Sequence, residues 1–117
     1  MTDLLEQKCV PCSGGLPPAT DAEIAQLRPQ IPDWLLVDKD GIKRLRRTYT
    51  FKDFQSAMAF SQAVGDEAEA AGHHPILTTE WGKATVEWWT HAIGGLHQND
   101  FIMAAKTDAV AQKLAAS

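Results

Sequence analysis

All four histidines of this chain lie between positions 73 and 97, although the chain has 117 positions. Two carboxylates, Glu69 and Asp100, flank the cluster. Imidazole exchanges protons near neutral pH and also binds metal ions. The segment therefore predicts a site for proton transfer, with metal binding as the alternative. The four histidines are His73, His74, His91 and His97.

The first two histidines are consecutive, and their neighbours predict different directions for them. Glu69 lies four residues before His73, so both are expected on one face at the C-terminal end of a helix. A carboxylate and the helix dipole favour imidazolium there, which makes His73 a candidate acid. His74 precedes Pro75, which favours an extended backbone, so the two rings are expected to project differently.

The third histidine follows a strand-like run with alternating side chains. His91 shares the parity of Glu87 and Trp89, a face too polar for a simple core, and is expected to join the pair. Trp89 is suited to stacking on a flat ligand. Asp100, as the cap of a final helix, is placed to accept a hydrogen bond from a ligand or from a histidine. His97, in a glycine-rich loop, is interpreted as a surface residue.

Metal and nucleophile chemistry are weaker interpretations of the same residues. Tandem histidines rarely chelate one ion, and the HExxH pattern is absent from the sequence. No Gly-x-Ser-x-Gly motif accompanies the histidines. Cys9 and Cys12 form a CxxC whose second half is missing, so we interpret them as a reduced pair. A zinc site made of Cys9, Cys12 and a histidine remains the alternative.

The composition is that of one globular domain. The 117 residues are 44% hydrophobic and 22% charged, and no uncharged apolar run approaches the ~18 residues that a membrane helix needs. The formal net charge of -4 argues against direct nucleic-acid binding. The N-terminus shows no export signal, so a cytoplasmic location and no membrane association are expected.

Turn and cap signals divide the chain into elements. We expect a flexible N-terminal arm over 1–19 and a single domain over 20–117. Thr20 predicts the cap of a helix over about 21–28. Asp40 and Gly41 predict a hairpin whose second strand, rich in Lys and Arg, is interpreted as exposed or at a sheet edge.

Three further elements complete the pattern. Apolar spacing predicts an amphipathic helix over about 53–71, ended by Gly72. A second hairpin is expected over 76–80 and 83–90, and a final helix over about 101–115. The order α-β-β-α-β-β-α predicts an α+β fold: a four-stranded antiparallel sheet with helices packed on one face.

The spacing of the site residues resembles the signature of the pterin-4a-carbinolamine dehydratases. Five residues separate His73-His74-Pro75 from Trp81, and nine separate Trp81 from His91. The resemblance spans about a third of the chain and is specific, because many residue types agree at fixed separations. The matching residues are Glu69, His73, His74, Pro75, Trp81, His91, Asp100 and Phe101.

The resemblance implies dehydration of 4a-hydroxytetrahydropterin to quinonoid dihydropterin without a metal or organic cofactor. It implies that His73, His74 and His91 are catalytic and that Glu69 and Asp100 support them. Members can have an aromatic residue at the position of Leu77, and Trp81 or Trp89 is expected to substitute for it as a substrate contact. We expect His73 and His74 to transfer protons and His91 to position the hydroxyl or share the acid role.

The resemblance also implies partners. It implies a homodimer or homotetramer and a functional link to an aromatic amino acid hydroxylase. The alternative is a non-catalytic interaction or assembly protein, such as a dimerisation cofactor of a transcription factor. Assembly-type relatives tend to lose the histidines, whereas His73, His74 and His91 are all present here.

Overall fold

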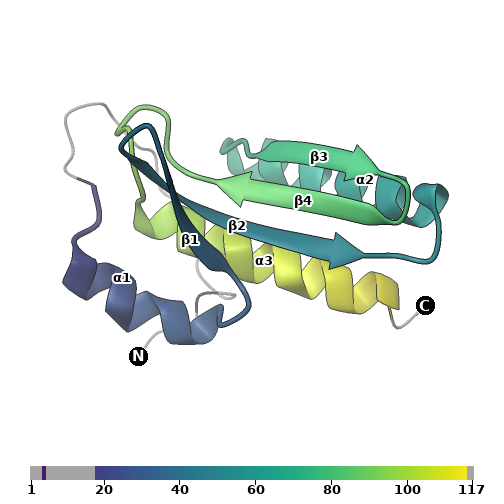
Figure 1. Ribbon diagram of the computed structural model, residues 1–117, viewed down its shortest axis with the longest axis horizontal. Helices are drawn as coiled ribbons and strands as arrows, with labels where there is room; N and C mark the ends of the chain where they lie inside the picture. Colours follow the sequence, from purple (N-terminus) through teal and green to yellow (C-terminus); the bar gives the residue numbers. More distant parts are fainter. Residues whose placement is uncertain (1–3, 5–17, 116–117) are drawn as a thin grey trace.

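The computed structural model describes Leu4 and residues 18–115, and the CxxC motif lies outside these residues. Three α-helices, one short 3-10 turn and four strands follow one another in the predicted order (Figure 1). The elements are α1 (Asp21–Leu27), η2 (Arg28–Gln30), β1 (Leu35–Lys39), β2 (Ile42–Thr50), α2 (Phe54–Ala71), β3 (Ile76–Glu80), β4 (Lys83–Trp88) and α3 (Gln98–Ala115).

The four strands form one antiparallel sheet in the order β1-β2-β4-β3. The predicted α+β fold is therefore confirmed. The expectation of an exposed or edge position for β2 is wrong, because β4 of the second hairpin pairs with it along six residue positions. Turn residues such as Asp40 and Gly41 predict which strands form a hairpin. They do not predict which strand of one hairpin pairs with a strand of the other, because that pairing is a long-range contact.

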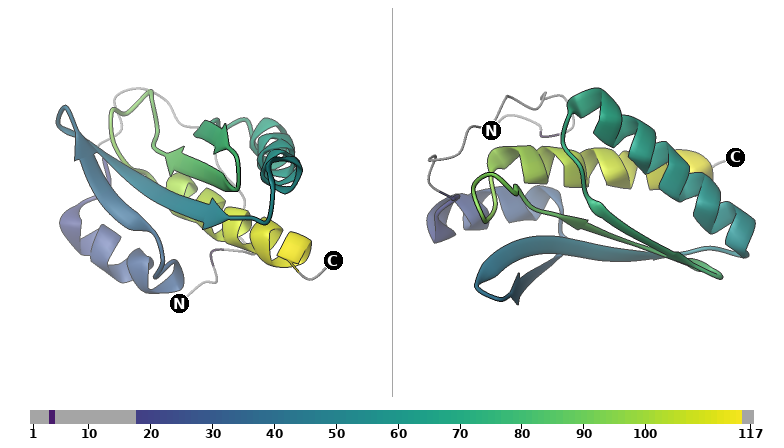
Figure 2. Two further views of the ribbon diagram at one scale, coloured as in Figure 1. Left: turned by 45° about the vertical axis from the view of Figure 1, so that its right-hand side comes forward. Right: turned by 90° about the horizontal axis from the view of Figure 1, so that it is seen from above.

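All three α-helices pack on one face of the sheet, as the view from above shows (Figure 2). The inward side chains of the central strands build the core with them: Leu45 and Tyr49 from β2, and Ala84, Val86 and Trp88 from β4 are buried. Phe60 of α2 packs at 4.7 Å from the Tyr49 ring. Full burial of a side chain such as Phe60 stabilises the fold by ~2–3 kcal/mol.

Local hydrogen bonds fix the ends of the first two helices as the sequence predicts. Thr20 caps α1 in a capping box, in which its backbone N–H donates to Glu23 and its hydroxyl accepts from the Glu23 N–H. These bonds lower the pKa of Glu23 below its usual value, the backbone donor contributing most. Gly72 ends α2 in the left-handed conformation, at φ 66°, which L-residues rarely adopt.

The last helix begins three residues earlier than predicted, at Gln98 rather than at Phe101. Asp100 is therefore not the cap but lies in the first turn. His97 precedes the helix, and its Nδ1 accepts from the Asn99 N–H at 3.1 Å. A histidine in this position is not among the favoured capping residues, which explains the misplaced start.

The fold brings two chain segments to the same end of the second hairpin. His73 and His74 precede β3, and Trp89 and His91 follow β4, its antiparallel partner. Leu4 is buried, and its N–H donates to the Gln30 side chain at 2.9 Å. Within the described part of the chain, no helix has the length and apolar character needed to cross a membrane.

Candidate active site

Asp100 is the centre of a buried hydrogen-bond network. Its side chain is 0% exposed, and both carboxylate oxygens are used. Oδ1 lies 2.6 Å from Nε2 of His73, and Oδ2 accepts from the Thr90 hydroxyl at 2.8 Å and from the His97 N–H at 2.9 Å. Three donors compensate the burial of one carboxylate, so Asp100 can be held as an anion away from water.

His73 is fixed by this carboxylate on one side and by Trp88 on its face. The two rings are almost parallel, with an angle of 7° and a centroid distance of 5.6 Å. Trp88 is held in turn, because its indole N–H donates to the Thr107 hydroxyl at 3.1 Å. His73 is only 11% exposed. With Nε2 directed at Asp100, Nδ1 is the nitrogen of His73 that remains for proton exchange.

Glu69 pairs with His74 and not with His73, which corrects the sequence interpretation. Its Oε1 lies 3.7 Å from Nε2 of His74. The reason is the left-handed conformation of Gly72, which ends the helix before His73. The four-residue spacing from Glu69 to His73 is therefore not a helical spacing. Glu69 and His74 are 82% and 59% exposed, so solvent screens this pair strongly.

His91 lies in a different environment, on the face of the sheet away from the helices. Its ring centroid is 4.3 Å from that of Trp89, with a tilt of 37°. The Arg44 guanidinium carbon lies 3.9 Å from the centroid of the same indole. Trp89 is thus buried between polar groups and does not present an open face, contrary to the expectation that it stacks on a flat ligand.

The structure does not bring Trp81 to the histidines. Trp81 lies in the turn between β3 and β4, 71% exposed, whereas the histidines lie at the other end of that hairpin. The five residues of β3 separate them by ~17 Å. Trp81 is therefore placed outside the cluster. The aromatic ring that stacks with His73 is the buried Trp88 of β4.

The remaining predicted residues lie at the same end of the β3–β4 hairpin, with His91 on the opposite side of the sheet from His73 and Asp100. Ile76 and Glu87 form the first pair of the β3–β4 ladder, and continuing this register sets His74 opposite Trp89 and His73 opposite Thr90. The shared bonds of His73 and Thr90 to Asp100 agree with that placement. Among the described residues, no three His, Cys, Asp or Glu side chains are grouped so as to hold a metal ion.

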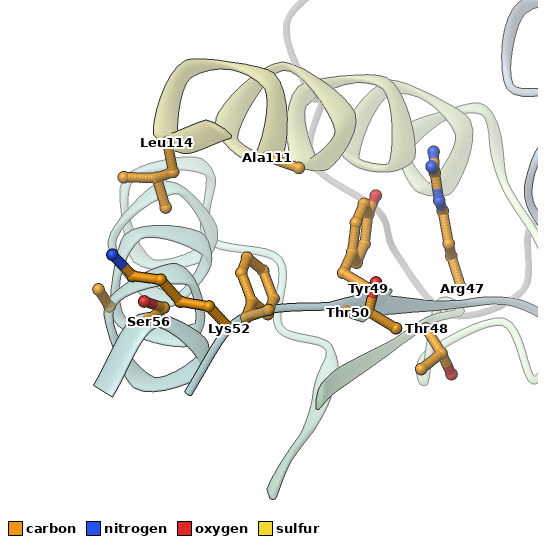
Figure 3. A pocket seen from close by; sticks show the side chains of 10 residues that line it. Arg47, Thr48, Tyr49, Thr50, Lys52, Ser56, Ala111 and Leu114 are labelled. Atoms are coloured by element: carbon orange, nitrogen blue, oxygen red, sulfur yellow. The ribbon is translucent and has the colours of Figure 1, made fainter. Parts of the chain in front are cut away.

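A second polar cluster lies around Asp108, about two turns further along α3. Its Oδ1 accepts from the Trp34 indole at 3.0 Å, from Arg47 at 2.7 Å and from the Tyr49 hydroxyl. Two cavities of about 640 and 670 Å³ share Arg47 and Tyr49 in their walls. In Figure 3 both side chains point from the sheet toward α3. The histidines remain the candidate site, because Arg47 and Tyr49 in the cavity walls already bind Asp108.

The structure is thus an α+β domain with a histidine–carboxylate cluster at one end of its second hairpin. Residues 17–110 match the family model described as pterin 4 alpha carbinolamine dehydratase. The chain belongs to the pterin-4a-carbinolamine dehydratase family, which confirms the resemblance seen in the sequence.

Two curated relatives carry the provisional name pterin-4-alpha-carbinolamine dehydratase. The protein of Chlorobium luteolum is 55% identical over 114 residues, 97% of this chain and 100% of the relative. The protein of Microcystis aeruginosa is 59% identical over 108 residues, 92% of this chain and 93% of the relative. The similarity therefore extends well beyond the histidine segment.

Two solved structures share the fold. A transcriptional coactivator/pterin dehydratase from Brucella melitensis superposes with a TM-score of 0.72 at 29% identity, covering 80% of this chain and 98% of the other. A pterin dehydratase-like protein identified as a RuBisCO assembly factor in the alpha-carboxysome has a TM-score of 0.57 at 20% identity, with coverage of 68% and 89%. The second similarity shows the fold alone.

Proposed function

We propose that this chain is a hydro-lyase that converts 4a-hydroxytetrahydropterin to quinonoid dihydropterin and water. The reaction removes the proton on N5, forms the C4a–N5 double bond and breaks the C4a–O bond, and the departing oxygen takes up a proton. An acid and a base suffice for these steps. The observation that carries the proposal is the 2.6 Å contact between His73 and the buried Asp100.

The contact suits His73 to the role of base. An ionised Asp100 holds the hydrogen on Nε2 and leaves the lone pair of Nδ1 to accept the N5 proton, because the carboxylate stabilises the imidazolium that results. Trp88 limits rotation of the ring. Asp100 is therefore a positioning residue in this proposal, and Thr90 supports it through its hydroxyl.

His74 and His91 supply the acid side of the reaction. His74 is exposed and paired loosely with Glu69, so its ring can exchange protons with solvent between turnovers. We assign proton delivery to the departing hydroxyl to His74, while His91 positions that hydroxyl or shares the acid role. Glu69 supports His74 in this assignment. Neither a metal nor an organic cofactor is required by this chemistry.

Dehydration assays on single variants test the proposal. We expect His73→Ala, His74→Ala and His91→Ala each to lower kcat on the order of 10²-fold, because each removes a group that acts in proton transfer. Stopped-flow measurement with chelator-treated protein checks this. Gln55→Ala, an exposed change on α2, is the matched control and should retain wild-type turnover. Wild-type protein without activity would refute the assignment.

The same proposal extends to the setting of the reaction. A dehydratase of this kind fits a cytoplasmic homodimer or homotetramer that recycles the pterin of an aromatic amino acid hydroxylase. Size-exclusion chromatography with light scattering measures the oligomeric state. A monomer at micromolar concentration would contradict that part of the proposal alone.

A non-catalytic interaction role is the second candidate. Several large apolar side chains are exposed on different elements, and a partner that covers one of them would bury apolar surface. The most exposed of them are Leu35, Met58 and Trp81, at 61%, 47% and 71%. Partners retained by a variant that lacks His73, His74 and His91 would favour this role over catalysis.

A further inference from the structure

The open face of the sheet carries a stack of three side chains, one from β2 and two from the segment that follows β4. Leu45 of β2 pairs with Trp88 of β4, so the next residues, Arg44 and Trp89, are direct neighbours across the strands. The Arg44 guanidinium carbon is 3.9 Å from the Trp89 centroid, and the His91 ring is 4.3 Å from it. Two planar groups this close to one centroid would collide on the same face. The indole is therefore sandwiched between Arg44 and His91.

Ordinary ion pairing does not account for the place of Arg44. The residue is buried, yet its Nη1 lies 3.8 Å from Glu87, too far for a good hydrogen bond. Its Nε is buried without a hydrogen-bond partner among the described residues. Burying a guanidinium with an unsatisfied donor is costly. The contact that is close and well formed is the one with the face of Trp89.

His91 depends on this stack for its orientation. It is exposed and follows the end of β4, and neither ring nitrogen has a hydrogen-bond partner among the described residues. His73, by contrast, is held by a carboxylate and a parallel indole. The contact that orients the His91 ring is therefore its packing on Trp89. A residue that holds the Trp89 ring in place therefore also determines the orientation of the His91 ring.

We propose that Arg44 is a positioning residue for the dehydration, which clamps Trp89 and through it holds the His91 imidazole toward the substrate. This inference rests on the proposed function and adds a residue that lies outside the histidine signature. Arg44 contacts no reacting atom in this role. Its removal is expected to lower kcat more than it changes KM, because the orientation of a reacting group changes while substrate binding is kept.

The experiment combines proton NMR of the His91 ring with steady-state kinetics. A ring stacked on indole has its Cε1 and Cδ2 proton signals displaced by the ring current. In Arg44→Ala we expect the His91 signals to move toward those of a free histidine and kcat to fall about tenfold. Arg44→Lys should restore part of both effects, because an ammonium group also binds an indole face.

Arg46→Ala is the matched control. Arg46 also meets Glu87, at 3.4 Å, but it is more exposed and has no contact with Trp89. We expect this variant to keep the His91 signals and kcat. Thermal unfolding of every variant separates loss of the stack from loss of the fold, and Arg44→Met, which keeps the length of the side chain, replaces Arg44→Ala if the latter unfolds.

Each outcome decides the proposal. Wild-type His91 signals and wild-type kcat in folded Arg44→Ala or Arg44→Met would overturn it, as would equal losses in Arg46→Ala. The NMR signals report the stack without turnover, so failure of the clamp is distinguishable from failure of the proposed function. Inactive wild-type protein with an intact stack would overturn the role of Arg44 in dehydration together with the dehydratase assignment.

Discussion

Two aspartates of α3, eight residues apart, each organise a polar cluster, and their donors differ. Asp100 in the first turn binds the His73 ring, the Thr90 hydroxyl and a backbone N–H. Asp108, further along the same helix, binds the Trp34 indole, Arg47 and the Tyr49 hydroxyl. Both carboxylates accept from three groups, but only the set around Asp100 includes a histidine, the residue type used most often for proton transfer.

The difference fits the proposed catalytic site at Asp100 and a structural junction at Asp108. The donors of Asp108 keep their protons at neutral pH, so that cluster can tie β2 to α3 but cannot turn over protons. One of the groups bound to Asp100 is His73, whose Nδ1 is still available to exchange a proton. The partners of a hydrogen-bonded carboxylate, and whether they can exchange a proton near neutral pH, are thus what distinguishes the two clusters. Equivalent substitutions at the two positions test this reasoning.

The largest effect is expected from Asp100→Asn. The amide can still accept from Thr90 and from the His97 N–H, but its NH₂ group then faces Nε2 of His73. That nitrogen must become the acceptor, which moves the hydrogen to Nδ1 and removes the lone pair proposed to take the N5 proton. We expect kcat to fall about 10²-fold or more. Wild-type kcat in a folded variant would contradict the assignment of His73 as base.

Asp108→Asn should show the opposite pattern, with stability lost and turnover kept. The change removes the charge that compensates Arg47 and leaves Asp33, 3.6 Å away and exposed, as its remaining carboxylate. We expect the free energy of unfolding to fall by ~2 kcal/mol. Urea unfolding measures the loss, and kcat within twofold of wild type is expected below the transition. A large loss of kcat would show that the two clusters are coupled.

The sequence predicted the elements well because their signals are local. Thr20 predicted the cap of α1, and Gly72 predicted the end of α2. The start of α3 was misplaced because Asp100 has the residue type of a cap, whereas the ring of His97 occupies that position. Capping preferences describe the residue types that usually cap helices, so they do not predict a helix that is capped by a histidine.

The site was recoverable only in part, because its contacts join distant segments. The spacing of the histidines and Asp100 identified the family. The prediction that Glu69 lies beside His73 was wrong, because it assumed that the helix continues beyond Gly72. Trp81 could have been excluded, since a residue in the turn of a hairpin cannot lie beside residues that flank its open end. Arg44 could not have been found, because its contact depends on the register between β2 and β4.

Tyr49→Phe is expected to give the smallest change in stability, and it tests the contribution of one donor to the Asp108 cluster. Burial, followed by the hydrogen bond to Asp108 and the charge of that carboxylate, raises the pKa of Tyr49, and Arg47 only partly offsets this. Tyr49 therefore stays protonated in the folded chain at pH values where the unfolded chain ionises. Its contribution to stability is complete below pH ~10 and is lost as the pH rises above that value.

Urea unfolding at pH 8 and pH 11 measures this contribution. We expect wild type to lose ~1.4 kcal/mol more than Tyr49→Phe between these pH values, because other groups titrate alike in both proteins. Tyr49 is the only tyrosine of the chain, so tyrosinate absorbance reports this residue alone. It should stay absent at pH 11 until the protein unfolds. Tyrosinate formed in folded protein near pH 10 would mean that Asp108 does not hold this hydroxyl, and the structural junction would then rest on Arg47 and Trp34.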